Sequence, residues 1–83
     1  MPLESTSQRV GGNVRAEMAR RRFSQDQIAK QLNISQQALS RRLIGRVPFT
    51  VDELDALADI LSVSIADLMR RHRADNEPGV KTA

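Results

Sequence analysis

The chain of 83 residues contains no cysteine, a single histidine, His72, and only two aromatic residues, Phe23 and Phe49. The lack of cysteine excludes a disulfide framework and a thiolate metal site. One imidazole in an arginine-rich stretch is better explained as a solvated group than as a ligand or base. No apolar run is long enough to cross a membrane, and nothing resembles a signal peptide. We therefore expect a cytoplasmic protein without a metal or a cofactor.

The residues that catalysis needs are also scarce. No carboxylate pair, nucleophile with a neighbouring base or glycine-rich phosphate loop can be assembled from the sequence. A chain of this length fits one small domain, which leaves no active-site cleft between domains. We predict that the protein is not an enzyme.

Positive and negative charges are separated along the chain. Residues 1–46 carry nine Arg or Lys and three acids, a net charge of +6, whereas residues 47–69 carry five acids and no basic residue, a net charge of −5. Residues 70–83, with four basic and two acidic side chains, bring the total to +3. One end of the domain is thus expected to face a polyanion such as nucleic acid. The alternative is that these charges only keep a small domain soluble.

The apolar spacing predicts an all-α fold of five helices, because no segment shows the alternation of a strand. We expect a flexible segment over residues 1–8, a compact domain over residues 9–73 and a disordered tail over residues 74–83, which has no apolar period. The first helix is expected to begin at Arg9 or Asn13 and to reach Arg22, because Gly11 and Gly12 weaken its start. The other predicted helix starts are Ser24 with Gln27, Ser35, Thr50 with Glu53, and Ser64 with Asp67. Gly45 is expected to end the third helix.

The predicted core is aliphatic. The two phenylalanines are expected to fill the joins between helices. The apolar positions at helical spacing are Val10, Val14, Met18, Ile28, Ala29, Leu32, Leu39, Leu43, Leu54, Leu57, Ala58, Leu61, Ile65, Leu68 and Met69.

The second and third predicted helices have the spacing of a helix-turn-helix, whose second helix lies in the DNA major groove. Counted from Gln25, the small residue falls at Ala29 and the turn residue at Asn33, which tolerates a left-handed conformation. The apolar sites of the motif fall at Ile28, Leu32, Ile34 and Leu39. Helical pairs of this kind also occur in proteins that bind no DNA, so a helical adaptor remains an alternative.

The stretch SQQALSRRLIGR, residues 35–46, determines which side chains could read bases. Leu39 and Leu43 mark the buried side of this helix, so the opposite stripe holds Gln36, Gln37, Ser40 and Arg41. Glutamine suits adenine and arginine suits guanine through two hydrogen bonds. The alternative for the two glutamines is a polar helix start without a role.

Several further residues are expected near phosphates. Arg42 lies about 100° around the helix from Arg41, so we expect its stem to cover the edge of the core and its head to extend toward a phosphate. We also assign phosphate contacts to Ser35, to Arg46 just after the helix, and to Arg15. Arg20, Arg21 and Arg22 could equally complement a helix dipole.

The chain resembles the lambda-repressor-like family of phage repressors, Cro proteins and related XRE-type regulators. The likeness is carried by FSQDQIAKQLNISQQALSRRL and DELDALADILSVSIADLM, within residues 9–70. It implies a five-helix domain that represses transcription, with Gln25 on a phosphate and Gln36 and Gln37 on bases. Relatives commonly bury an arginine against a glutamate at the positions of Met18 and Leu43, so an apolar contact is expected to replace that ion pair.

The function expected from these features is a phage-type repressor or Cro-like regulator bound to double-stranded operator DNA. The alternative is an antitoxin that regulates its own operator and neutralises a toxin partner. We expect a homodimer, at least on DNA, formed through the apolar end of the last helix at Leu68 and Met69. A monomer on an asymmetric site remains open.

Overall fold

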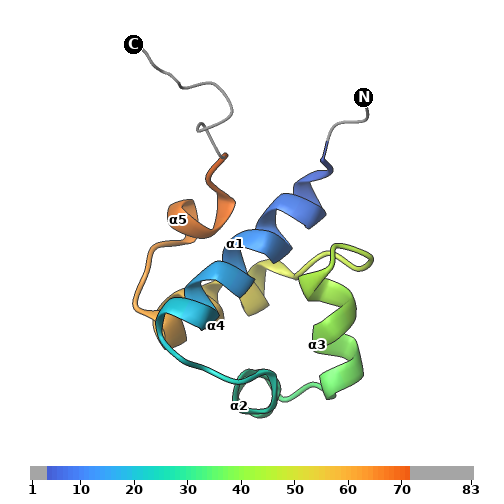
Figure 1. Ribbon diagram of the computed structural model, residues 1–83, viewed down its shortest axis with the longest axis vertical. Helices are drawn as coiled ribbons and strands as arrows, with labels where there is room; N and C mark the ends of the chain where they lie inside the picture. The colour runs from blue at the N-terminus through green and yellow to red at the C-terminus, as the bar shows by residue number, and fades with distance from the viewer. Residues whose placement is uncertain (1–3, 72–83) are drawn as a thin grey trace.

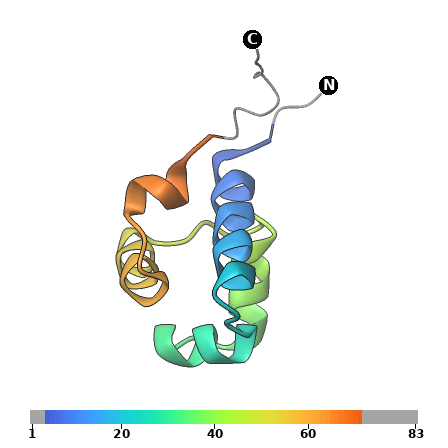
Figure 2. The same ribbon diagram turned by 60° about the vertical axis from the view of Figure 1, so that its left-hand side comes forward.

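The computed structural model describes residues 4–71 of the chain. Within that range the predicted all-α fold is confirmed, with five helices and no strand. The long first helix packs against α3 on one side and against α5 on the other, and α2 lies at the end of the molecule away from the start of α1 and the end of α5 (Figures 1 and 2). The helices are α1 (Thr6–Arg20), α2 (Gln25–Leu32), α3 (Gln36–Leu43), α4 (Val51–Leu61) and α5 (Ile65–Met69).

The start of α1 corrects the prediction of a flexible segment up to residue 8. The Oγ of Ser5 accepts a hydrogen bond from the backbone N of Gln8 at 3.0 Å, and the Gln8 side chain accepts from the Ser5 N at 2.9 Å. This capping box starts the helix at Thr6, before the expected Arg9 or Asn13. The predictions for His72 and for the tail at residues 74–83 lie outside the described residues.

Side chains at the other four helix starts act as predicted. Capping boxes open α2, α4 and α5, and the Ser35 hydroxyl accepts from the backbone of Ala38 to open α3. Asn33 closes α2 in the left-handed conformation, with a φ of 59°. The prediction that Gly45 ends α3 is confirmed: Gly45 follows the C-cap Ile44 with a φ of 85°, and its N–H donates to the Arg42 oxygen at 3.2 Å, which closes the helix end.

The aliphatic core is confirmed with one exception. Ile65, the first residue of α5, is 38% exposed, whereas Leu68 of the same helix is fully buried. Phe23, Phe49, Leu32 and Met69 are partly buried against the core. The core residues are Val10, Val14, Met18, Ile28, Ala29, Leu39, Leu43, Leu54, Leu57, Ala58, Leu61 and Leu68. Met18 and Leu43, for which an apolar contact is expected from the sequence, are both buried in this cluster.

Gly11 sets how closely α1 approaches the end of α3. A Cβ atom at this position would stand 2.8 Å from the backbone oxygen of Arg42 and would collide with that of Leu43. Gly45 is as closely packed, because its Cβ would lie 2.6 Å from the Cγ of Gln8. These two close approaches fix the position of α3 on α1. From the sequence, Gly11 had been expected only to weaken the first helix.

Asn13 is a polar residue of the core that the apolar spacing does not predict. Only 5% of its surface is exposed, and its Nδ2 donates to the backbone oxygens of Leu68 at 2.9 Å and Arg70 at 2.8 Å. These oxygens belong to the end of α5, where carbonyl groups have no partner within the helix. The amide therefore ties α5 to α1. Its place on the apolar stripe between Val10 and Val14 was the available signal.

Candidate nucleic-acid interface

The helix-turn-helix is formed by α2, α3 and a tight turn between them. The backbone N–H of Ile34 donates to the oxygen of Ala29 at 3.0 Å, and Asn33 reverses the chain in the left-handed conformation. Ser35 then starts α3 at once. The close packing of Gly11 on the other end of α3 completes its support. The second helix of the motif is therefore held at both of its ends.

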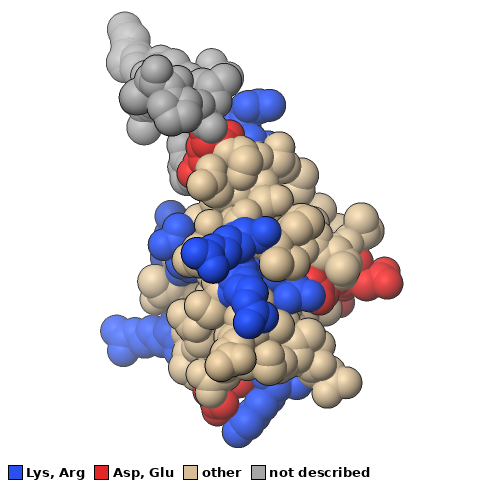
Figure 3. All heavy atoms as spheres, turned by 90° about the vertical axis from the view of Figure 1, so that its right-hand side faces the viewer, with Lys and Arg blue, Asp and Glu red and all other residues tan. Residues whose placement is uncertain are grey.

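The four predicted base-reading residues lie together on the solvent side of α3. Leu39 and Leu43 are 0% and 1% exposed, and the flanking positions Ala38 and Arg42 are partly covered. The remaining arc is exposed and consists of Gln36, Gln37, Ser40 and Arg41. Figure 3 views the molecule from the α3 side and shows Lys and Arg side chains across it, with acidic side chains toward its edges. This face has the charge and the hydrogen-bonding groups that a nucleic acid requires.

The side chain of Gln36 has a partner that was not anticipated. Its Nε2 donates to the Oδ1 of Asp26, in the first turn of α2, at 3.0 Å. The other carboxylate oxygen of Asp26 lies 3.2 Å from the Nζ of Lys30. The first residue of α3 is thus connected to α2 by its side chain as well as by the turn.

The prediction for the head of Arg42 is wrong. Its Nε lies 3.0 Å from the Oε1 of Glu53, at the start of α4, and its Nη1 donates to the backbone oxygen of Ala38 at 3.1 Å. The guanidinium turns toward α4, where the carboxylate of Glu53 accepts from it. The side chain of Arg42 is 18% exposed. No local pattern around Arg42 indicates a partner that lies eleven residues away.

The other residues assigned to phosphate are exposed. Gln25 is the first residue of α2, and Ser35 caps α3 while its hydroxyl hydrogen stays available. Arg46 is placed beside the end of α3 by its backbone N–H, which donates to the Arg41 oxygen at 2.9 Å. Arg15 lies one turn after Gly11, on the stripe of α1 that approaches α3.

The arginines at the end of α1 have a structural explanation. Arg20 Nη1 lies 2.7 Å from one carboxylate oxygen of Glu17, and Arg21 Nε lies 3.6 Å from the other. Arg22 follows with a φ of 60°, in the turn that leads to α2. Within residues 4–71, Arg15, Arg41 and Arg46 are not engaged in an ion pair with any acidic side chain, which distinguishes them from Arg20 and Arg21.

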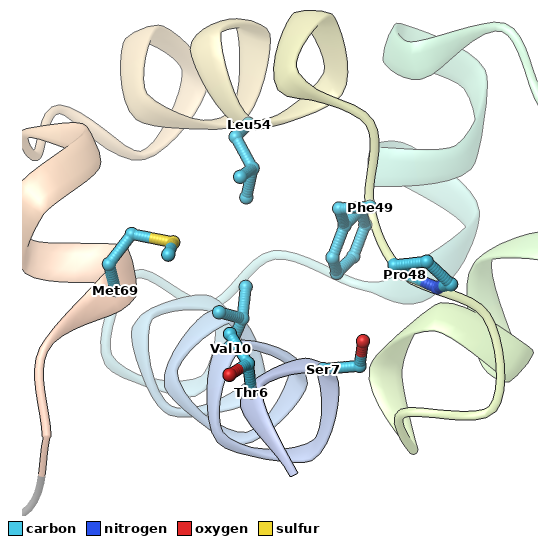
Figure 4. A pocket seen from close by; sticks show the side chains of 7 residues that line it. All are labelled: Thr6, Ser7, Val10, Pro48, Phe49, Leu54 and Met69. Atoms are coloured by element: carbon cyan, nitrogen blue, oxygen red, sulfur yellow. The ribbon is translucent and has the colours of Figure 1, made fainter.

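The remaining surface features of the described part do not add to this interface. A small, mostly apolar pocket opens between α1, α4, α5 and the loop before α4, and none of the predicted DNA-contacting residues lines it (Figure 4). The pocket residues are Thr6, Ser7, Val10, Pro48, Phe49, Leu54 and Met69. Over residues 4–71 no group of His, Asp or Glu could hold a metal ion. No helix in that range has the length and apolar character to span a bilayer.

Two solved structures share the fold. The clp gene regulator ClgR from C. glutamicum is 24% identical, with a TM-score of 0.72 over 82% of this chain and 86% of that one. The hypothetical transcription factor NHTF from Neisseria is 18% identical, with a TM-score of 0.75 over 90% and 92% of the two chains. No curated protein sequence matches the chain. The family profile of the Cro/C1-type HTH DNA-binding domain matches residues 13–73, which include α2, α3 and more than half of α1. The chain therefore belongs to the Cro/C1-type helix-turn-helix DNA-binding family, as its sequence resemblance predicted.

Proposed function

We propose that the protein is a sequence-specific regulator of transcription, a repressor or Cro-like protein, that reads an operator with α3 in the major groove. The exposed arc of Gln36, Gln37, Ser40 and Arg41 carries this proposal. Glutamine can bind adenine and arginine can bind guanine through paired hydrogen bonds, and serine can contact either. The family supports DNA as the partner, and the names of both structural neighbours describe regulators.

The residues proposed to hold the DNA backbone surround that arc. Arg46 follows α3, Arg15 lies on the adjacent side of α1, and Gln25 and Ser35 stand at the starts of α2 and α3. Helix starts carry a partial positive charge and unpaired N–H groups, which favour a phosphate. Arg42 is left out of this set because its guanidinium is engaged with Glu53.

Selection from a random duplex library tests the proposal, because it requires no assumption about the operator sequence. The purified protein is expected to enrich one sequence pattern, and its affinity for that duplex should fall steeply between two salt concentrations. Replacing Gln36, Gln37 and Arg41 together with alanine should abolish the enrichment but retain salt-dependent binding. Binding without any enriched sequence would contradict the base-reading role, and a lack of salt-dependent binding would favour a helical adaptor.

We also propose that two copies bind together on DNA, at half-sites about one helical turn, roughly 34 Å, apart. Leu68 is 0% exposed and cannot form the contact assigned to it from the sequence. Ile65, which is 38% exposed, and the partly buried Met69 are the apolar groups that α5 can offer. Sedimentation of the protein with the selected full operator is expected to give two copies per duplex. One copy per duplex at saturation would support the monomer.

A further inference from the structure

The contact between Gln36 and Asp26 restricts which edge of the Gln36 amide can face the DNA. A carboxylate only accepts hydrogen bonds, so the group that faces Oδ1 at 3.0 Å must be the amide nitrogen. The amide oxygen therefore points away from Asp26. A rotation of the amide by 180° would place its oxygen against the carboxylate and would lose the bond.

An amide nitrogen has two hydrogens, and Asp26 uses one of them. The second hydrogen and the oxygen of Gln36 remain for a ligand, which gives one donor and one acceptor. Adenine presents the matching pair, an acceptor at N7 and a donor at N6, whereas guanine presents two acceptors. From these observations we propose that Asp26 is a positioning residue that fixes the amide of Gln36 for adenine.

The surroundings of Asp26 are compatible with a position near DNA. A carboxylate close to the phosphate backbone is unfavourable, but the Nζ of Lys30 lies 3.2 Å from Oδ2 and offsets its charge. The two oxygens of Asp26 thus have different partners, one amide and one ammonium group. The carboxylate that accepts from Gln36 is thus itself paired with Lys30.

A purely structural explanation predicts a different behaviour. Asp26 lies in the first turn of α2, where the negative charge of an acid interacts favourably with the helix dipole and so stabilises the helix. Its ion pair with Lys30 adds to the stability of α2. Those effects alter the stability of the fold and the affinity for every duplex alike. They do not alter the preference for one base at one position. Base preference is therefore the measurement that separates the two roles.

The test rests on the proposed function and uses the full chain with the selected duplex and its single-base variants. Gln36→Ala identifies the base pair that Gln36 reads, as the position where preference is lost. Asp26→Ala is expected to lower the preference for adenine at that same position about three- to tenfold, and to leave the other positions unchanged. In the Gln36→Ala background, Asp26→Ala should have no further effect on preference, because it acts through the amide.

Two more variants serve as controls for changes in side-chain size and in charge. Asp26→Asn keeps the size of the side chain but can donate as well as accept, so it permits both orientations of Gln36 and should also lower the preference. Asp52→Ala removes an acid from the corresponding position in the first turn of α4 and should leave the preference intact. Thermal melts of all variants identify any that do not fold.

The outcomes separate the inference from the function on which it rests. If Gln36→Ala abolishes the preference at one base pair and both Asp26 variants retain it, the positioning role is overturned and base reading by α3 stands. If the wild-type protein enriches no sequence, the proposed function is overturned together with the inference. If the wild-type protein enriches a sequence but Gln36→Ala changes no preference, Gln36 does not read a base and the inference is overturned.

Discussion

Arg42 and Glu53 join α3 to the following helix through an ion pair, with 3.0 Å between Nε and Oε1. The same carboxylate oxygen accepts from the backbone N of Thr50 at 2.9 Å and so also completes the cap of α4. The two side chains are only 18% and 15% exposed. One glutamate therefore both starts α4 and connects it to α3, which makes its charge and its capping role separable by mutation.

Glu53→Gln is expected to destabilise the protein by about 1–3 kcal/mol, because the charge of Arg42 loses its partner in a partly buried place. Glutamine preserves the cap, as it does at Gln8 and Gln27 in this chain. Glu53→Ala should cost about 1 kcal/mol more, through the additional loss of the cap. Urea denaturation of both variants measures these differences. Equal stability of Glu53→Gln and the wild type would show that the ion pair contributes nothing.

Gly11→Ala should destabilise the fold by about 1–3 kcal/mol or more, because its methyl group would meet the backbone of α3. The adjacent Gly12→Ala is the matched control. Its Cβ would meet only the Nη2 of Arg15 at 3.6 Å, an ordinary contact, so better helix propensity should stabilise it by about 0.5–1 kcal/mol. Thermal melts compare the pair, and a stabilised Gly11→Ala would mean that α3 can move away without cost.

Asn13→Asp should be more damaging than Asn13→Ala. Both lose the two bonds to the oxygens of Leu68 and Arg70, and either loss costs about 1–3 kcal/mol. The aspartate adds a carboxylate that faces two carbonyl oxygens. Because a protonated carboxyl can donate, the stability gap between the two variants should narrow as the pH falls toward about 4, the ordinary pKa of an aspartate. A gap that is independent of pH would argue against this geometry.

Arg41→Ala is expected to cost about 1–3 kcal/mol of binding and to relax the preference at one base pair. Arg46→Ala should weaken all duplexes alike and lower the salt slope by about one, because it is proposed to contact a phosphate. Titration of both protein variants with the operator and its single-base variants at two salt concentrations distinguishes the base-reading role of Arg41 from the phosphate-binding role of Arg46. Arg42→Ala should lower folding stability, as expected from its pair with Glu53. The assignment fails if Arg41→Ala leaves every base preference unchanged.

The pKa of Asp67 is lowered from its ordinary value of 3.8, chiefly by the backbone N–H of Ser64, which donates to its carboxylate, and further by the Ser64 side chain and Arg70. A lowered pKa stabilises the fold above the unfolded value and loses this effect as the pH falls through the folded value. The stability difference between wild type and Asp67→Ala should therefore be constant above about pH 5 and shrink below pH 3.8. Denaturation at a series of pH values measures it, and a difference that grows in acid would contradict the assignment.

The exposed arc of α3 could be predicted because it depends on a local rule. Once Leu39 and Leu43 are assigned to the core, helix geometry alone places Gln37 and Arg41 on the outside. The direction of each exposed side chain could not be predicted in the same way. Gln36 turns toward Asp26 and Arg42 toward Glu53, and both partners come from other helices.

Local sequence was sufficient to specify the helix starts, the turn of the helix-turn-helix and most of the core, because capping and apolar spacing act within a few residues. Even the start of α1 at Ser5 had its capping signal in Gln8, three residues further on. Packing between helices was needed to place Gly11 on α3, to bring Asn13 to the end of α5 and to turn Arg42 away from solvent. Each of these depends on groups that are far apart in the chain, from eleven residues for Arg42 and Glu53 to 57 for Asn13 and Arg70. A buried donor or charge takes whichever partner the packing brings within reach, and local sequence does not specify that partner.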